Sequence, residues 1–254
     1  MYKDFWRIFV ATVLRDMRTR FGRTYVSFLI SIAWPLTHLS IICSVYYLSN
    51  KIVPIGDDLG VFVTTGVAPY IFCLYPARFT ANAVVQNKAL LQFAIIKPLH
   101  LVMARAVLEI FSASIVFAIF SSTLFAMGVA IVPFDIHRAF SALAATIFLG
   151  IGIGFFGVSL SALNAIVGAL TTAFSIVGMY LASGAFLPPS LMTPAVRDMM
   201  FYNPLYHSVG ILRSTYFDGF EGDDCRVSYI LLIGCVYFFL GLAGERLIRG
   251  RIMI

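Results

Sequence analysis

Very few ionisable side chains lie inside the long apolar runs of this sequence. Such a residue is a candidate for function, because burying its charge in lipid is costly. Arg78 lies near the end of its run, where its long stem can reach the surface. Arg105 and Glu109 are four residues apart, so one helix face can pair them. His38 remains as the deep candidate, and a proton-coupled carrier would need more buried carboxylates than this sequence offers.

The stretch "GIGIGFFG", residues 150–157, contains a GxGxxG pattern inside an apolar run. A dinucleotide site needs this pattern between a strand and a helix of a βαβ unit. Gly150 and Gly154 also form GxxxG, which is typical of close helix packing in membranes. No GxxxxGK[ST] motif is present. The chain therefore has no P-loop of its own, and ATP-driven transport would need a separate ATP-binding polypeptide.

No other group of residues predicts catalysis or a metal site. The acidic run from Asp218 to Asp224 does not match the spacing of an EF-hand loop, so we expect a solvated loop there. His207 and Asp198 have no nucleophile motif such as GxSxG beside them. The four cysteines show no CxxC or paired spacing. We predict no catalytic residue, no metal and no cofactor bound by this chain.

Composition places these residues in a membrane protein. Of the 254 residues, 60% are hydrophobic and 12% are charged, and ordinary soluble domains carry about twice that charge. The apolar runs between charged residues are long enough to cross a bilayer as helices, and they do not alternate as barrel strands do. They predict an all-α membrane protein with six transmembrane helices, near residues 27–48, 60–77, 104–131, 140–163, 167–187 and 227–243.

Charge is distributed unevenly over the ends of the six predicted spans. Basic residues gather before the first span, between the second and third, and after the sixth, whereas most acidic residues fall in the other loops. The positive-inside rule then places both termini in the cytoplasm. It also accounts for the net charge of +6 without a nucleic-acid partner.

The segment "FWRIFVATVLRDMRTRFG", residues 5–22, predicts a basic amphipathic helix ahead of the first span. Its apolar residues recur at steps of three and four, and Arg7, Arg15 and Arg18 fall on the other side of the helical wheel. Such a helix lies on the membrane surface, and this pattern does not resemble a cleaved signal peptide. Two interpretations stay open, a plain membrane anchor and a docking platform for a cytoplasmic subunit.

Two further regions are more apolar than their predicted positions require. Residues 86–105, "QNKALLQFAIIKPLHLVMAR", are helix-patterned up to Pro98. They predict either a helix parallel to the membrane that offers Leu91, Phe93 and Ile95 to a partner's groove, or an extension of the third span. Residues 188–226 are apolar but broken by prolines. They predict two short re-entrant helices with a turn at Asn203–Pro204, an arrangement tolerated only inside protein or beside a water-filled path.

Aromatic side chains are frequent in the first and fifth predicted spans and in the outer segment. Some are expected in the belts at the membrane–water interface. Others could line a path for a large amphipathic solute, because aromatic rings stack on the CH faces of sugars and leave the hydroxyls wet. The candidates for this lining are Trp34, Tyr46, Tyr47, Phe174, Tyr180, Phe186, Tyr202 and Tyr206.

Four stretches, in this order along almost the full length, carry a family resemblance: LRDMRTRFG (14–22), WPLTHL (34–39), IKPLHLVMARAVLE (96–109) and NPLYHSVGILRS (203–214). The chain resembles the membrane permease of ABC-2 exporters, most closely those that export capsular polysaccharide. The resemblance implies a homodimer paired with two cytoplasmic subunits that bind ATP and Mg²⁺. It also implies that the N-terminal helix and the loop at 86–98 touch these subunits.

We therefore predict a single transmembrane domain over residues 1–254. It comprises an interfacial helix at 1–24, five spans over 27–187, an outer re-entrant segment at 188–226, a sixth span at 227–244 and a cytoplasmic tail at 245–254. Candidate ATPase-coupling residues are Arg15, Arg18, Arg20, Lys88, Leu91, Phe93, Lys97 and Pro98. Candidates without an assigned role are His38, Asn203, His207 and Arg213.

The predicted function is that of a transport subunit, not an enzyme, in the bacterial inner membrane. It would move capsular or similar lipid-linked polysaccharide, with periplasmic and outer-membrane export components as further partners. The alternatives are an ABC-2 permease for O-antigen, teichoic acid or another lipid-linked glycan, a secondary carrier, and a membrane-embedded glycan transferase.

Overall fold

The computed structural model describes residues 2–21, 25–48, 55–56, 58–220, 222 and 224–252, without the side chains of residues 2, 3, 20, 21, 25–28, 31 and 248–252. Every regular element in these ranges is a helix. The long helices are α1 (Tyr2–Phe21), α2 (Tyr25–Leu48), α3 (Leu59–Ala81), α5 (Pro98–Ala126), α6 (Ile136–Leu163), α7 (Ala165–Leu181) and α10 (Val227–Ile252). The short ones are α4 (Ala83–Gln86), the 3₁₀ helices η1 (Lys88–Gln92) and η2 (Pro189–Leu191), α8 (Pro194–Met200) and α9 (Pro204–Ser214).

Four helices in the described part of the chain are long and apolar enough to cross a membrane: α3, α5, α6 and the Val227–Leu247 part of α10. Two shorter apolar helical stretches accompany them, Ile32–Leu48 of α2 and all of α7. Four membrane-length apolar helices in one chain confirm the prediction of an all-α membrane protein.

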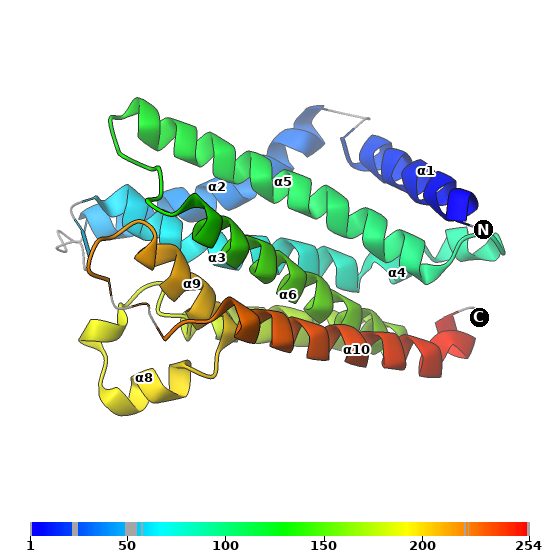
Figure 1. The fold of residues 1–254 in the computed structure, drawn as a ribbon. Helices are drawn as coiled ribbons and strands as arrows, with labels where there is room; N and C mark the ends of the chain where they lie inside the picture. Colours follow the sequence, from blue (N-terminus) through cyan, green and yellow to red (C-terminus); the bar gives the residue numbers. More distant parts are fainter. Residues whose placement is uncertain are drawn as a thin grey trace.

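The two termini lie at the same end of the helix bundle (Figure 1). Helices α1 and α4 lie at this end as well, whereas α8, α9 and the connection from α5 to α6 lie at the opposite end. The distribution of basic residues in the sequence predicts that both termini lie on the same side.

Helix α6 is packed between α3 and α10, and glycines make this packing close. A Cβ added to Gly150 would lie 2.5 Å from the backbone oxygen of Cys73 on α3. A Cβ added to Gly152 would lie 2.5 Å from the backbone oxygen of Gly234 on α10. The prediction that these glycines serve helix packing is therefore confirmed.

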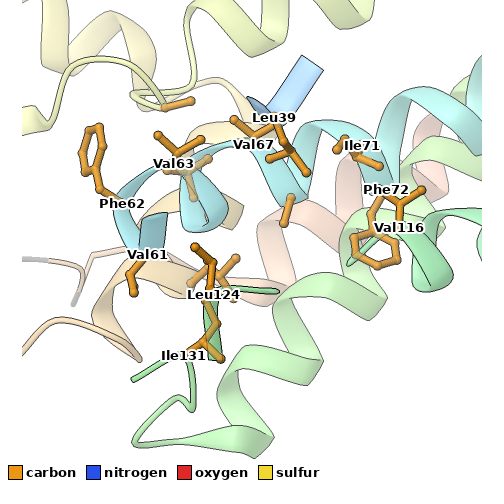
Figure 2. Close-up of a cluster of buried hydrophobic side chains, with 14 of the residues drawn as sticks. Leu39, Val61, Phe62, Val63, Val67, Ile71, Phe72, Val116, Leu124 and Ile131 are labelled. Atoms are coloured by element: carbon orange, nitrogen blue, oxygen red, sulfur yellow. The ribbon is translucent and has the colours of Figure 1, made fainter. Parts of the chain in front are cut away.

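Of the four membrane-length helices, α3 is the most enclosed, with 78% of the residues in its most apolar stretch buried. Figure 2 shows its side chains, among them Val67 and Phe72, meeting Leu39 of α2 and Val116 and Leu124 of α5 in one cluster of buried apolar side chains. This core lies within a single chain and anchors α3, against which α9 packs at the bundle end opposite the termini.

The third predicted span has different bounds in the structure. Lys97 is extended, with φ −104° and ψ 152°, as expected before a proline, and Pro98 begins α5. At the other end Gly128 takes φ +85°, and the N–H of Val129 donates to the backbone oxygen of Leu124 at 3.1 Å. This glycine-terminated end explains why the helix covers 98–126 rather than 104–131. The charged residues used as boundaries do not mark its ends.

Within the outer segment, residues 188–226, α8 and α9 are separated by a turn at Asn203–Pro204, as the sequence predicts, but their environments differ. In α9 nearly every side chain is buried, from Pro204 to Arg213, and the helix packs among α3, α6, α7 and α10. In α8 no side chain is buried, and the helix stands away from the bundle (Figure 1). Only α9 is thus inserted among the long helices.

Candidate functional site

The backbone after α7 leaves the helical conformation while it is still enclosed by protein. Ser183, Gly184 and Ala185 are buried, and Gly184 takes φ +75°, a conformation that favours glycine. Non-helical backbone exposes carbonyl groups that need hydrogen-bond partners when no water is present. This segment therefore depends on side chains from other elements.

Arg213 of α9 supplies two of these partners. Its Nη1 donates to the backbone oxygen of Gly184 and its Nη2 to that of Ala185, both at 2.6 Å. The guanidinium also lies 4.3 Å from the ring centroid of Phe62 on α3, which is favourable for a desolvated cation. Arg213 is completely buried. Its role in the structure is to hold the non-helical end of α7 against α3 and α9.

Asn203 connects the end of α7 to the start of α9. Its Nδ2 donates to the backbone oxygens of Met179 at 2.6 Å and Ala182 at 2.8 Å. Its Oδ1 accepts from the N–H of Leu205 at 3.0 Å, which caps α9. The two kinds of partner fix the orientation of the amide. One side chain thus satisfies groups at two helix ends that would otherwise lack partners.

His207 makes a similar connection between α8, α9 and α10. Its Nδ1 accepts from the N–H of Arg226 at 3.2 Å, so its Nε2 carries the proton and donates to the backbone oxygen of Phe201 at 2.8 Å. The ring packs 4.6 Å from the rings of both Phe201 and Tyr229. The predicted candidates Asn203, His207 and Arg213 therefore lie in one region, where they join helix ends.

His38 belongs to an aromatic cluster between α2, α3 and α7. Its Nε2 lies 3.4 Å from the hydroxyl of Tyr180. Tyr180 stacks on Tyr70 with ring centroids 3.9 Å apart and also contacts Phe186. The hydroxyl of Tyr46 donates to the backbone oxygen of Phe186 at 2.6 Å. The cluster continues to Phe62 through a ring contact with Tyr46, and so reaches the Arg213 site.

The eight aromatic residues predicted to line a path separate into two groups. Tyr180 and Tyr206 are buried, and Tyr46 and Phe186 are partly buried, so these four are packing residues of a single chain. The other four are largely exposed on the single chain: Trp34 (72%), Tyr47 (77%), Phe174 (71%) and Tyr202 (78%). The exposed group is accessible at the surface of the single chain, and the lining role of all eight stays a prediction.

At the opposite end, α1 is attached to the start of the predicted coupling loop. Nη1 of Arg15 donates to Oδ1 of Asn87 at 3.0 Å, and the ring of Phe5 lies 4.6 Å from that of His100. Trp6, Val10 and other apolar side chains of the same helix are exposed. The structure thus brings together α1 and residues 86–100, as expected if both serve one partner.

The predicted single helix over residues 86–98 is wrong. Asn87 separates α4 from η1 because its backbone is not helical, with φ −117° and ψ 24°. Residues 93–97 are also not helical and lead into Pro98. Two local causes apply. The side chain of Asn87 donates to the backbone oxygen of Ala83 at 2.9 Å, and the proline disfavours a helical residue before it.

The predicted coupling residues have different exposures. Phe93 is 61% exposed; Lys88 and Lys97 are also exposed, and so are Arg15 and Arg18 on α1. Leu91 is partly buried against a cluster that contains Val84 and Val102, and Pro98 is buried. The side chain of Arg20 lies outside the described residues. The exposed members are thus available to a partner, whereas Leu91 and Pro98 hold the loop.

Several contributing residues were missed from the sequence. Asn87, Tyr70 and Phe62 give no local signal, because their partners are distant along the chain.

The predicted pair of Arg105 and Glu109 is present, at 3.5 Å. Among the described residues there is no group of three metal-binding side chains. Glu221 and Asp223 of the acidic run lie outside those residues. Asn203, His207 and Arg213 satisfy backbone groups, an arrangement suited to positioning helices.

The fold is that of a helical membrane protein whose long apolar helices pack into one bundle. A family model described as ABC-2 type transporter matches residues 7–217, and the chain belongs to this family. The polysialic acid transport protein KpsM of Escherichia coli is 25% identical over 242 residues, which cover 92% of this chain and 90% of KpsM. The capsule polysaccharide export inner-membrane protein CtrC of Neisseria meningitidis serogroup B is 25% identical over 237 residues, which cover 93% of this chain and 89% of CtrC.

Proposed function

We propose that this chain is the permease subunit of an ATP-driven exporter that moves a capsular or similar lipid-linked polysaccharide across the bacterial inner membrane. The observation that carries this proposal is the similarity, over about nine-tenths of both chains, to KpsM and CtrC within the ABC-2 family. The sequence contains no P-loop. ATP and Mg²⁺ are therefore bound by two copies of a partner ATPase, and this chain supplies the membrane path.

In this proposal α2 and α7 are the first and fifth of six spans. Helix α2 has 24 residues and is about 36 Å long, which exceeds the roughly 30 Å of hydrocarbon. Helix α7 has 17 residues, so it is only about 26 Å long. The buried segment after α7 and the inserted helix α9 occupy the remaining depth, which makes α9 the re-entrant helix. Helix α8 lies at the outer surface.

The bundle end that holds both termini is cytoplasmic in this proposal. Support comes from the basic residues gathered there, including Arg7, Arg18, Lys88 and Lys97, because cytoplasmic ends of membrane helices are enriched in lysine and arginine. The exposed side chains of α1 and of residues 88–97 then face the ATPase together. Motion of the ATPase reaches the spans through the contact of Arg15 with Asn87 and through the start of α5.

A homodimer would meet through α2 and α7. The exposed face of α2 carries Thr37, Ser40 and Ser44, and that of α7 carries Thr171 and Gly178. By contrast, the exposed middle of α10 is purely apolar, from Leu231 to Leu240. Small and hydroxyl side chains on an outward face are suited to close helix contact or to a water-filled path, not to lipid. The exposed Trp34 and Phe174 lie on these same helices and would line the path.

The coupling role is tested in vesicles that contain this chain and its ATPase. The double variant Lys88→Ala/Phe93→Ala is expected to lower glycan export at least tenfold relative to ATP hydrolysis, because it removes an exposed ring and a charge from the proposed contact. Phe111→Ala, which removes an equally exposed ring from the middle of α5, should leave the ratio unchanged. Equal ratios for the two variants would remove residues 88–93 from the mechanism. Sugar transfer by the purified chain alone would favour the transferase instead.

A further inference from the structure

A narrow crevice lies between α5, α6 and α10, close to the bundle end that holds the termini. Its volume is about 200 Å³. Its inner wall is formed by apolar side chains, Val102 from α5, Phe155 and Val158 from α6, and Leu242 from α10. Charged side chains border its mouth: Lys97, Glu245 and Arg246.

We propose that this crevice binds one anionic diacyl phospholipid of the cytoplasmic leaflet, with an acyl chain against the apolar wall and the headgroup phosphate between Lys97 and Arg246. The inference rests on the proposed function only for the cytoplasmic position of this end. The apolar wall offers no hydrogen-bond partner, so a hydrocarbon chain fits it and a sugar would lose its hydrogen bonds there.

The charges at the mouth favour an anionic headgroup. Lys97 and Arg246 together carry two positive charges, Glu245 carries one negative charge, and the sum is positive. Basic pockets between transmembrane helices on the cytoplasmic side are suited to anionic lipid headgroups. The α5 helix also begins here, at Pro98, and the positive end of its dipole adds to the potential.

The crevice opens on a surface that is itself suited to lipid. Leu99, at the crevice, is partly exposed (36%), and Leu247, one residue beyond Arg246 in α10, is 88% exposed. The exposed side chains of α10 from Leu231 to Leu240 are also apolar. A lipid in the surrounding bilayer can therefore place its chain in the crevice without leaving the membrane, which a soluble partner cannot do.

The site has a consequence for coupling, because Lys97 takes part in a second hollow. Lys97 also lines the hollow between α1 and residues 94–100, together with Phe5 and His100. A phosphate held by Lys97 would restrain the end of the predicted coupling loop at the point where α5 begins. The lipid would thus stabilise the position of the loop that contacts the ATPase.

The test measures lipid retained by the purified full-length chain, by native mass spectrometry after exchange into phosphatidylglycerol or phosphatidylcholine with identical acyl chains. Phosphatidylglycerol should be retained in preference. Arg246→Gln should weaken its retention roughly fivefold, the effect of one cation near a headgroup, and Glu245→Gln should strengthen it. Arg226→Gln, just before the other end of α10, is the matched control and should change nothing.

Two further experiments test the binding of the acyl chain separately from that of the headgroup. Val158→Trp fills the crevice and should abolish the preference, whereas Leu247→Trp adds the same ring to the open surface and should not. Soluble glycerol phosphate should not displace the lipid. Equal retention of the two lipids, equal effects of the two arginine variants, or displacement by glycerol phosphate would overturn the proposal. A chain that retains phosphatidylglycerol but exports no glycan when reconstituted with its ATPase would contradict the proposed function and leave this site standing.

Discussion

Replacing Asn203 with alanine tests the contact between α7 and α9 most sharply. The change removes two donors from the backbone oxygens of Met179 and Ala182 and one acceptor from the N–H of Leu205. Each lost hydrogen bond lowers stability by about 1 kcal/mol. The bond to Leu205 is the helix cap, and about 1 kcal/mol also agrees with the usual loss for a cap. The three bonds together therefore contribute about 3 kcal/mol.

Asn164 offers a matched control within the same chain. Its Oδ1 accepts from the N–H groups of Ile166 and Val167 at the start of α7, but its side chain makes no second bridge. The two bonds share one acceptor oxygen and together form a single N-cap, so Asn164→Ala should lower stability by about 1 kcal/mol. On the scale of soluble domains of this size, 1 kcal/mol shifts the melting temperature by about 2–4 °C. We expect shifts of about 6–12 °C for Asn203→Ala and about 2–4 °C for Asn164→Ala.

The assay is thermal unfolding of the detergent-solubilised chain, followed by the loss of its monodisperse elution peak. Asn203→Asp adds a discriminating variant. It keeps the acceptor for Leu205 but turns a carboxylate toward two carbonyl oxygens, so its melting temperature should fall close to that of the alanine variant. Equal shifts for Asn203→Ala and Asn164→Ala, or an aspartate variant as stable as the parent, would refute the bridge between α7 and α9.

Three other changes follow from the contacts. Tyr46→Phe removes the hydroxyl that donates to Phe186 and should lower stability by about 1 kcal/mol, measured in the same thermal assay; no shift would show that water replaces this bond. Gly152→Ala places a Cβ 2.5 Å from a backbone oxygen of α10 and should destabilise by about 1–3 kcal/mol; an unchanged melting temperature would contradict the close packing of α6 on α10. Burial, reinforced by Asp224, raises the pKa of the Cys225 thiol to about 11. Its alkylation by a water-soluble maleimide, in a chain with no other cysteine, should rise until that pH; a plateau near pH 8.5, about the ordinary thiol pKa, would contradict the burial.

Local patterns in the sequence predicted the features that depend on neighbouring residues. Apolar runs located the long helices, the glycines of residues 150–157 predicted the packing of α6, and Asn203–Pro204 predicted the break between α8 and α9. Arg105 and Glu109 pair as their spacing predicts. These features follow from helix periodicity and from the special conformations of glycine and proline, so no distant information is needed.

Features that depend on distant residues could not be predicted. Arg213 binds carbonyl groups of Gly184 and Ala185, and Arg15 binds Asn87, which is 72 residues away. Both Tyr180 and Trp34 lie in apolar runs, yet Tyr180 is buried and Trp34 is exposed. The packing of α2, α3 and α7 determines which aromatic side chains are buried. The ends of α5 were misplaced because charged residues were used as boundaries, although membrane helices extend beyond the hydrocarbon and can pair charges within a turn.

In the proposed function, a partner's ATP hydrolysis drives a lipid-linked glycan through this chain. This function is tested most directly by reconstituting the purified permease with its ATPase in vesicles that carry radiolabelled lipid-linked capsular glycan, and by measuring transfer of the label across the bilayer. We expect ATP-dependent transfer only when both subunits are present and none with the permease alone. Transfer by the permease alone would contradict the proposed function. So would a complex whose ATP hydrolysis is stimulated by the glycan but which transfers none of it.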